Sequence, residues 1–122
     1  MEFLLDKGSG DYRIKSYYQG IFTVNEITYS TSIIVMPDLI ISPWGPTSLR
    51  SLQASDFDKL LDLKPQVVLL GTGQQLQFPK PSFFSLFAKQ EIGLEVMDTQ
   101  AACRTYAVLM SEGRKVAAAL LP

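Results

Sequence analysis

Residues 67–73 read VVLLGTG: four large apolar residues run directly into a loop that contains two glycines. A continuous apolar run of this length is typical of a strand buried on both faces of a parallel sheet. The glycines also suggest a phosphate-binding loop, but the Gly-Lys-Ser/Thr triplet of such a loop is absent, and the third glycine of a dinucleotide-binding fingerprint would fall at Leu76. We therefore favour a structural role for Gly71 and Gly73, which let the chain turn sharply off a buried strand, over anion binding.

Helical and strand patterns alternate on both sides of this stretch. Apolar residues recur at helical spacing over residues 82–91 and 100–112, and further strands are predicted over residues 94–97 and 116–121. A short helix that begins near Ser55 and ends at Pro65 precedes the apolar strand of residues 67–70. Strands that are joined by helices in this way predict right-handed crossovers and parallel pairing.

Polar and glycine residues mark the ends of the predicted helices. Thr99 is placed to cap the last helix, because its hydroxyl can accept a hydrogen bond from a free backbone N–H of the first turn. Gly93 and Gly113 are placed for the C-terminal ends of the second and third helices.

The first third of the chain is predicted to form antiparallel strands. Apolar, aromatic and β-branched residues dominate residues 12–17, 21–24, 27–29, 32–36 and 39–42, with turn-forming residues between them. Asn25-Glu26 fits a two-residue hairpin loop. We expect a meander here, and one α/β domain over residues 1–122. Its β-rich part (1–42) forms an antiparallel element that packs onto a βαβαβ part (43–122), whose sheet is mostly parallel.

Composition and charge exclude several classes of protein. The 122 residues include 11 Lys and Arg against 12 Asp and Glu, so the net charge of −1 leaves no cation excess for nucleic acid. No apolar run approaches the roughly 20 residues that cross a bilayer, so membrane insertion is not expected. No secretory or mitochondrial targeting pattern opens the chain, and we expect a cytoplasmic protein.

The chain also lacks the usual residues of catalytic and metal sites. Histidine is absent, which removes the common neutral-pH acid or base and the commonest nitrogen ligand, and the one cysteine offers no CxxC pair. Cys103 lies beside Arg104 near the start of the last helix, where a thiolate is favoured, but its place at the edge of the apolar stripe favours a buried packing role. We expect no metal, no cofactor and no catalytic residue that can be named.

One pair of loops remains as a candidate binding site. Asp98 and Thr99 join a predicted strand to a helix at the sheet edge that also holds Gly71, Thr72 and Gly73, and ligands of open α/β sheets bind at this edge. Arg104, one turn into the helix, adds a positive charge. The competing interpretation, which we favour, is that Thr99 only caps its helix while Asp98 bonds nearby backbone.

Two aromatic side chains are also candidates for contacts with a ligand or a partner. Trp44, between Pro43 and Gly45-Pro46, is expected to anchor a loop by packing rather than to stack on a ligand. Phe84 is a candidate for an exposed contact, but most of the four phenylalanines of residues 78–87 are expected in the core.

The chain resembles a known family in the segments SPW (42–44), GTG (71–73) and EVMDTQAACRTYAVLMSEGRKVAAALL (95–121), and in the strand and helix pattern between them. The family is the one called domain of unknown function 498. The resemblance covers nearly the whole chain and implies a three-layer α/β fold with a mixed sheet and extra β structure. The family includes a mitochondrial assembly factor for respiratory complex I, and it supplies no established catalytic residue. It usually has asparagine after the Thr-Tyr pair, where this chain has Ala107, so a site that uses that amide would differ here.

Two functions follow as hypotheses. The leading one is a non-enzymatic cytoplasmic interaction or assembly protein that holds another polypeptide. The alternative is a small-molecule or anion binder, or an enzyme, that uses the crevice between Gly71–Gly73 and Asp98–Arg104. The identity of the partner or ligand is open, and so is homo-oligomer formation.

Overall fold

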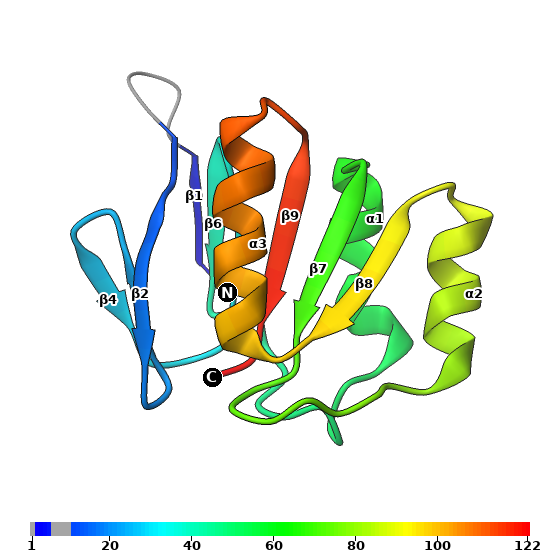
Figure 1. Cartoon of the computed structure of the whole chain (residues 1–122). Helices are drawn as coiled ribbons and strands as arrows, with labels where there is room; N and C mark the ends of the chain where they lie inside the picture. The colour runs from blue at the N-terminus through cyan, green and yellow to red at the C-terminus, as the bar shows by residue number, and fades with distance from the viewer. Residues whose placement is uncertain (1, 6–10) are drawn as a thin grey trace.

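The computed structural model describes residues 2–5 and 11–122, which form two β-sheets and the helices that cover them (Figure 1). The larger sheet has six strands in the order β1-β6-β5-β9-β7-β8. Their bounds are β1 Glu2–Leu5, β5 Ile33–Met36, β6 Leu39–Ser42, β7 Val67–Gly71, β8 Gly93–Met97 and β9 Val116–Leu120. Strand β7 pairs in parallel with both β8 and β9, whereas β5 pairs antiparallel with β6 and β9, and β1 antiparallel with β6. The sheet is therefore mixed.

The smaller sheet is an antiparallel meander of three strands in the order β2-β3-β4. It consists of β2 Ile14–Tyr18, β3 Ile21–Val24 and β4 Ile27–Tyr29. Asn25 has a φ of 54°, and Val24 pairs with Ile27, which confirms the predicted two-residue hairpin loop. Figure 1 shows this sheet beside helix α3 (Thr99–Ser111).

Helices and the smaller sheet enclose the central sheet from both sides. Helix α3 and the smaller sheet pack on one face, where Phe22, Tyr106 and Leu69 belong to one buried cluster. On the other face lie the 3-10 helix η1 (Ala54–Phe57), α1 (Asp58–Leu63) and α2 (Pro81–Lys89), which share a second cluster that includes Phe57 and Phe87. The three layers and the mixed sheet confirm the predicted fold class.

The N-terminal part of the chain departs from the predicted meander. Only β2 to β4 form the added antiparallel element, whereas β5 and β6 extend the central sheet, with Ile33 opposite Leu120 and Ile34 opposite Ala119. All of Ile33–Met36 is buried, because this strand is covered on both faces. The two parts predicted for residues 1–42 and 43–122 thus share one sheet.

Several predicted helix boundaries are wrong by one to three residues. The first helical segment is preceded by Gln53 rather than Ser55, and the Gln53 N–H donates to the Asp56 carboxylate (2.7 Å). Gly93 does not end α2 but begins β8, and Glu91, with a φ of 59°, takes the left-handed conformation there instead. Gly113, with a φ of 77°, follows α3 as predicted.

The aromatic residues divide between the core and the surface. Trp44 is buried, its indole N–H donates to the Asp56 carbonyl (2.9 Å), and its ring lies 6.0 Å from that of Phe57, which confirms its role as a loop anchor. Phe83 and Phe87 are buried as well, whereas Phe78 and Phe84 are exposed. The expectation that most of the four phenylalanines serve the core is therefore wrong, because only two of them are buried.

Within the described part of the chain, no helix is both long enough and apolar enough to span a bilayer.

Candidate functional site

The Gly71-Thr72-Gly73 loop leaves strand β7 at the edge of the sheet where its parallel strands end. The Leu121 N–H donates to the Gly71 carbonyl (3.0 Å), and the Thr72 N–H donates to the Met97 carbonyl (2.9 Å), so the loop is bonded to the strands on both sides. The Thr72 hydroxyl donates to the Gln75 carbonyl (2.8 Å) and accepts from the Gln77 N–H (3.2 Å). The polar groups of Thr72 are thus engaged within the loop and with β8.

Thr99 connects this loop with helix α3 and the last strand. Its side chain is fully buried; the hydroxyl accepts a hydrogen bond from the Gly73 N–H (2.8 Å) and donates one to the Leu121 carbonyl (2.6 Å). Its own N–H donates to the Gly73 carbonyl (2.9 Å). The hydroxyl therefore bonds segments far apart in the sequence rather than its own helix.

The expectation that Thr99 caps α3 is wrong. The N-cap residue is Asp98, whose carboxylate accepts from the Ala101 N–H (2.8 Å). Thr99 is instead the first residue of α3, and its hydroxyl bonds to the backbone of Gly73 and Leu121. Asp98 does bond nearby backbone, as predicted.

Gly71 allows the close approach of β7 and the start of α3. A Cβ atom at this position would lie 2.8 Å from the Thr99 Oγ1 and 3.0 Å from the Thr99 Cα. Because the second of these is a backbone atom, any side chain here would push the helix away from the sheet. Gly73, with a φ of 106°, supplies the turn. Gly73 therefore has the turn role that the sequence favoured, whereas Gly71 ends β7 and is needed for close packing against Thr99 instead.

The α3 N-terminus has little capacity left for an anion. The Thr99 and Ala101 N–H groups, which an anion would use, already donate to the Gly73 carbonyl and the Asp98 carboxylate. A hollow of about 330 Å³ borders Thr72 and Gly73 at this edge, and the side chains that line it are uncharged. Ligand binding by the predicted crevice stays a prediction. The hollow beside the GTG loop offers no positively charged side chain for it.

Arg104 lies apart from the two glycines, in a hollow between β2 and α3. This hollow has a volume of about 350 Å³, and its lining includes Tyr17, Cys103, Arg104 and Ala107 but none of the residues 71–73. The structure thus joins Gly71, Gly73 and Thr99 in one hydrogen-bonded junction through Leu121. Asp98 precedes Thr99 and bonds to its own helix, and Arg104 lies at a different site. No local sequence pattern indicates this second site, because its β2 wall is distant from α3 in the chain.

Cys103 is buried against the smaller sheet, as predicted for a packing residue. Burial raises the pKa of its thiol from 9.0 to about 12, although the neighbouring Arg104 opposes the change. The thiol is therefore neutral at physiological pH.

We expect native Cys103 to react very slowly with iodoacetamide. A pKa raised by about three units lowers the thiolate fraction near neutral pH roughly a thousandfold, and burial hinders access further. The measurement compares labelling rates at pH 7.5 in buffer and in denaturing urea by mass spectrometry. Rates within a factor of ten of each other would contradict a buried thiol.

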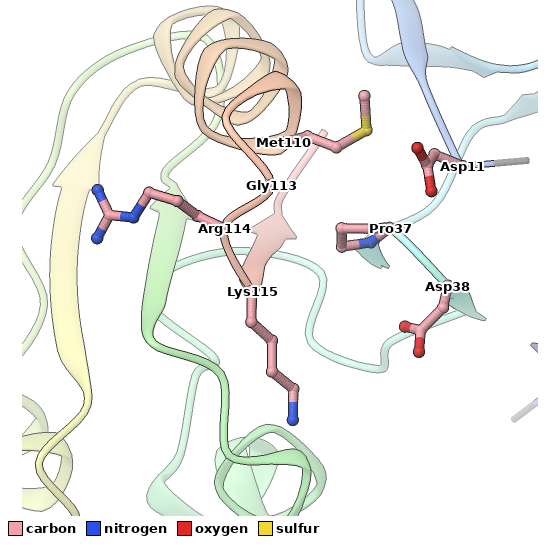
Figure 2. A pocket seen from close by; sticks show the side chains of 7 residues that line it. All are labelled: Asp11, Pro37, Asp38, Met110, Gly113, Arg114 and Lys115. Carbon is pink, nitrogen blue, oxygen red and sulfur yellow. The ribbon is translucent and has the colours of Figure 1, made fainter.

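A further hollow, of about 340 Å³, lies at the opposite end of α3, near the start of β9. Figure 2 shows Asp11, Pro37 and Asp38 across from the turn that joins α3 to β9, whereas the Arg114 side chain extends away from both aspartates. The charges around this hollow are therefore not directed at a common point. Across residues 2–5 and 11–122, no group of three or more Cys, Asp or Glu side chains is placed to hold a metal ion.

Comparison with known proteins places the chain in a family. The family model described as "Protein of unknown function (DUF498/DUF598)" matches residues 14–121. The chain belongs to this family. The match confirms the resemblance seen in the sequence and covers both the GTG loop and the α3 to β9 segment.

Curated proteins that are similar to this chain include two with different names. The chain is 30% identical over 111 residues to a Bos taurus protein named NADH dehydrogenase [ubiquinone] 1 alpha subcomplex assembly factor 3, covering 89% of this chain and 60% of that protein. It is also 26% identical over 108 residues to the "13 kDa major membrane protein" of Francisella tularensis, with 88% of each chain covered. The chain therefore spans about three fifths of the length of the bovine relative and most of the bacterial one.

A solved structure is also similar to this chain. The NMR structure of a Xanthomonas campestris protein is 42% identical, with a TM-score of 0.83, and the match covers 90% of this chain and 83% of that one. This likeness supports the three-layer arrangement described above.

Proposed function

We propose that this protein is a non-enzymatic assembly protein of the cytoplasm, which holds another polypeptide while a larger complex forms. The bovine relative is named as an assembly factor for NADH dehydrogenase, and the match covers 89% of this chain. The cytoplasmic location is part of the proposal, and cell fractionation with an antibody to the chain tests it.

One structural observation carries the proposal: three exposed apolar side chains lie within a short stretch of the chain, two in the loop after β7 and one on α2. Phe78 is 73% exposed, Leu76 51% and Phe84 40%, all within nine residues of chain. Exposed aromatic and aliphatic side chains that follow one another along the chain favour an interaction surface, because leaving them in water is unfavourable. We call Leu76, Phe78 and Phe84 the apolar segment.

The chemistry of the neighbouring sheet edge also favours binding over catalysis. The hydroxyls of Thr72 and Thr99 there already have backbone partners. A hydroxyl nucleophile needs an adjacent base to activate it, and the sequence contains no histidine for this role. The exposed rings of the apolar segment are thus the more distinctive surface.

The test is complementation of a deletion strain. We expect loss of the gene to lower the amount of one assembled multi-subunit complex on native gels, with NADH dehydrogenase examined first. Wild-type protein restores that complex, whereas Phe78→Ser does not, because truncation of an aromatic anchor typically weakens a protein interface by about 2 kcal/mol, roughly thirtyfold.

Val108→Ser is the matched control, since Val108 is 55% exposed but lies on α3, outside the apolar segment. Both variants should keep the wild-type melting temperature, and the control should restore the complex. A deletion that leaves every multi-subunit complex at its normal level, or full rescue by Phe78→Ser, would contradict the proposal.

A further inference from the structure

The hollow between β2 and α3 has the size and the mixed lining of a small-molecule site. Its volume of about 350 Å³ lies in the range of natural ligand pockets. The Tyr17 ring, Ile14 and Ala107 give it apolar walls, and Gln100 adds an exposed amide. The Tyr17 ring is itself held in place by stacking on buried Phe22, with ring centroids 5.0 Å apart.

Two positive charges border this hollow from different elements. Lys15 comes from β2 and Arg104 from α3, and both side chains are exposed. Among the residues that the structure describes, neither forms an ion pair. Asp98 is the acidic group near Tyr17, and its carboxylate already accepts from the Ala101 N–H. The hollow therefore offers two unneutralised cations.

A polar atom without a partner lies in the same place. Among the described residues, the Tyr17 hydroxyl is the one buried side-chain oxygen or nitrogen that makes no hydrogen bond. Buried polar groups in folded proteins nearly always have a partner, so an unsatisfied one calls for an explanation. Tyr17 lines the hollow together with Lys15, Gln100 and Arg104, whose exposed side chains can change conformation when a ligand enters.

We propose that this hollow binds a small organic anion, with a carboxylate held by Arg104 and Lys15 and an apolar body against the Tyr17 ring. An oxygen of the ligand accepts the hydrogen bond of the Tyr17 hydroxyl. This site is separate from the apolar segment, and the inference goes beyond the assembly function.

Benzoate is the probe, and benzamide, which has nearly the same shape without the charge, is its matched control. Titration of ¹⁵N-labelled protein with benzoate should shift the amide signals of residues 14–17 and 100–107 in a saturable manner. Benzamide should bind at least roughly tenfold more weakly, because a charge-assisted hydrogen bond is lost.

Variants then test the residues. Arg104→Ala should weaken benzoate binding roughly tenfold, whereas Arg114→Ala, which removes an equal charge at the other end of α3, should leave it unchanged.

Tyr17→Phe should weaken benzoate binding by about threefold to tenfold. Without ligand, the same variant should raise the melting temperature by about 3–5 °C, because an unsatisfied buried hydroxyl is removed. Opposite effects on binding and stability are not expected of a purely structural tyrosine.

Three results would overturn the inference. They are the absence of saturable shifts at these amides, equal affinities for benzoate and benzamide, and an equal loss of affinity in Arg104→Ala and Arg114→Ala. The last would indicate attraction by net charge alone.

Discussion

Replacing Gly71 by alanine is expected to lower the free energy of unfolding by about 3 kcal/mol, the upper end of the usual range for overpacking. The new Cβ would lie 2.8 Å from the Thr99 Oγ1, 3.0 Å from the Thr99 Cα and 3.1 Å from the Leu120 Cδ2. Leu120 is fully buried and the Thr99 Cα is backbone, so neither can yield without moving α3 or β9. Urea denaturation followed by circular dichroism gives the change.

Gly93→Ala is the matched control, because Gly93 lies on the neighbouring strand β8 and pairs with the other end of β7. A Cβ there would meet the Val67 Cγ2 at 3.5 Å, an ordinary contact. We expect a change of less than about 1 kcal/mol, since alanine is itself favoured over glycine within a strand. Similar losses at both positions would show that close approach of Thr99 is not the reason for Gly71.

Thr99→Val should destabilise the protein by about 2 to 4 kcal/mol. Valine keeps the shape of threonine but removes the hydroxyl, so the Gly73 N–H and the Leu121 carbonyl both lose a partner in a buried place. Each buried polar group left unsatisfied costs about 1–3 kcal/mol. The same denaturation experiment measures the loss.

Thr99→Ser separates the hydroxyl from the methyl group. Serine keeps both hydrogen bonds and loses one buried methyl, so we expect a loss of about 1 kcal/mol. If valine proved no worse than serine, the bonds to Gly73 and Leu121 would not contribute to stability, and packing alone would explain Thr99.

Ordinary sequence patterns predicted most of the secondary structure. The apolar run of residues 67–70, with helices on both sides in the chain, indicated a buried strand with parallel neighbours, and β7 is buried along its length between β8 and β9. Helix and strand periods are local properties, since a residue's face depends only on its spacing from its neighbours. The turn at Gly73 and the packing of Cys103 and Trp44 were likewise predicted from local residue type and spacing, whereas the packing role of Gly71 was not.

The predicted site mixed residues that the fold keeps together with one that it separates. Gly71, Gly73, Asp98 and Thr99 do meet, because the carboxyl ends of adjacent parallel strands share one edge. Arg104 lies one turn further along α3 and lines the hollow beside β2 instead. The direction of a helical side chain follows from its spacing, but the element that it faces does not.

By itself, then, the sequence determined the α/β class, the parallel βαβαβ order and the absence of a phosphate-binding motif, since all three follow from local spacing and residue type. Only the tertiary structure decided that β5 pairs with β9, that Thr99 bonds to Gly73 and Leu121, and that the Tyr17 hydroxyl is buried beside α3. The partners of Thr99 are 26 and 22 residues away in the chain. Contacts of this kind form because the whole core packs at once, and no local pattern of residues specifies which distant backbone groups that packing brings together.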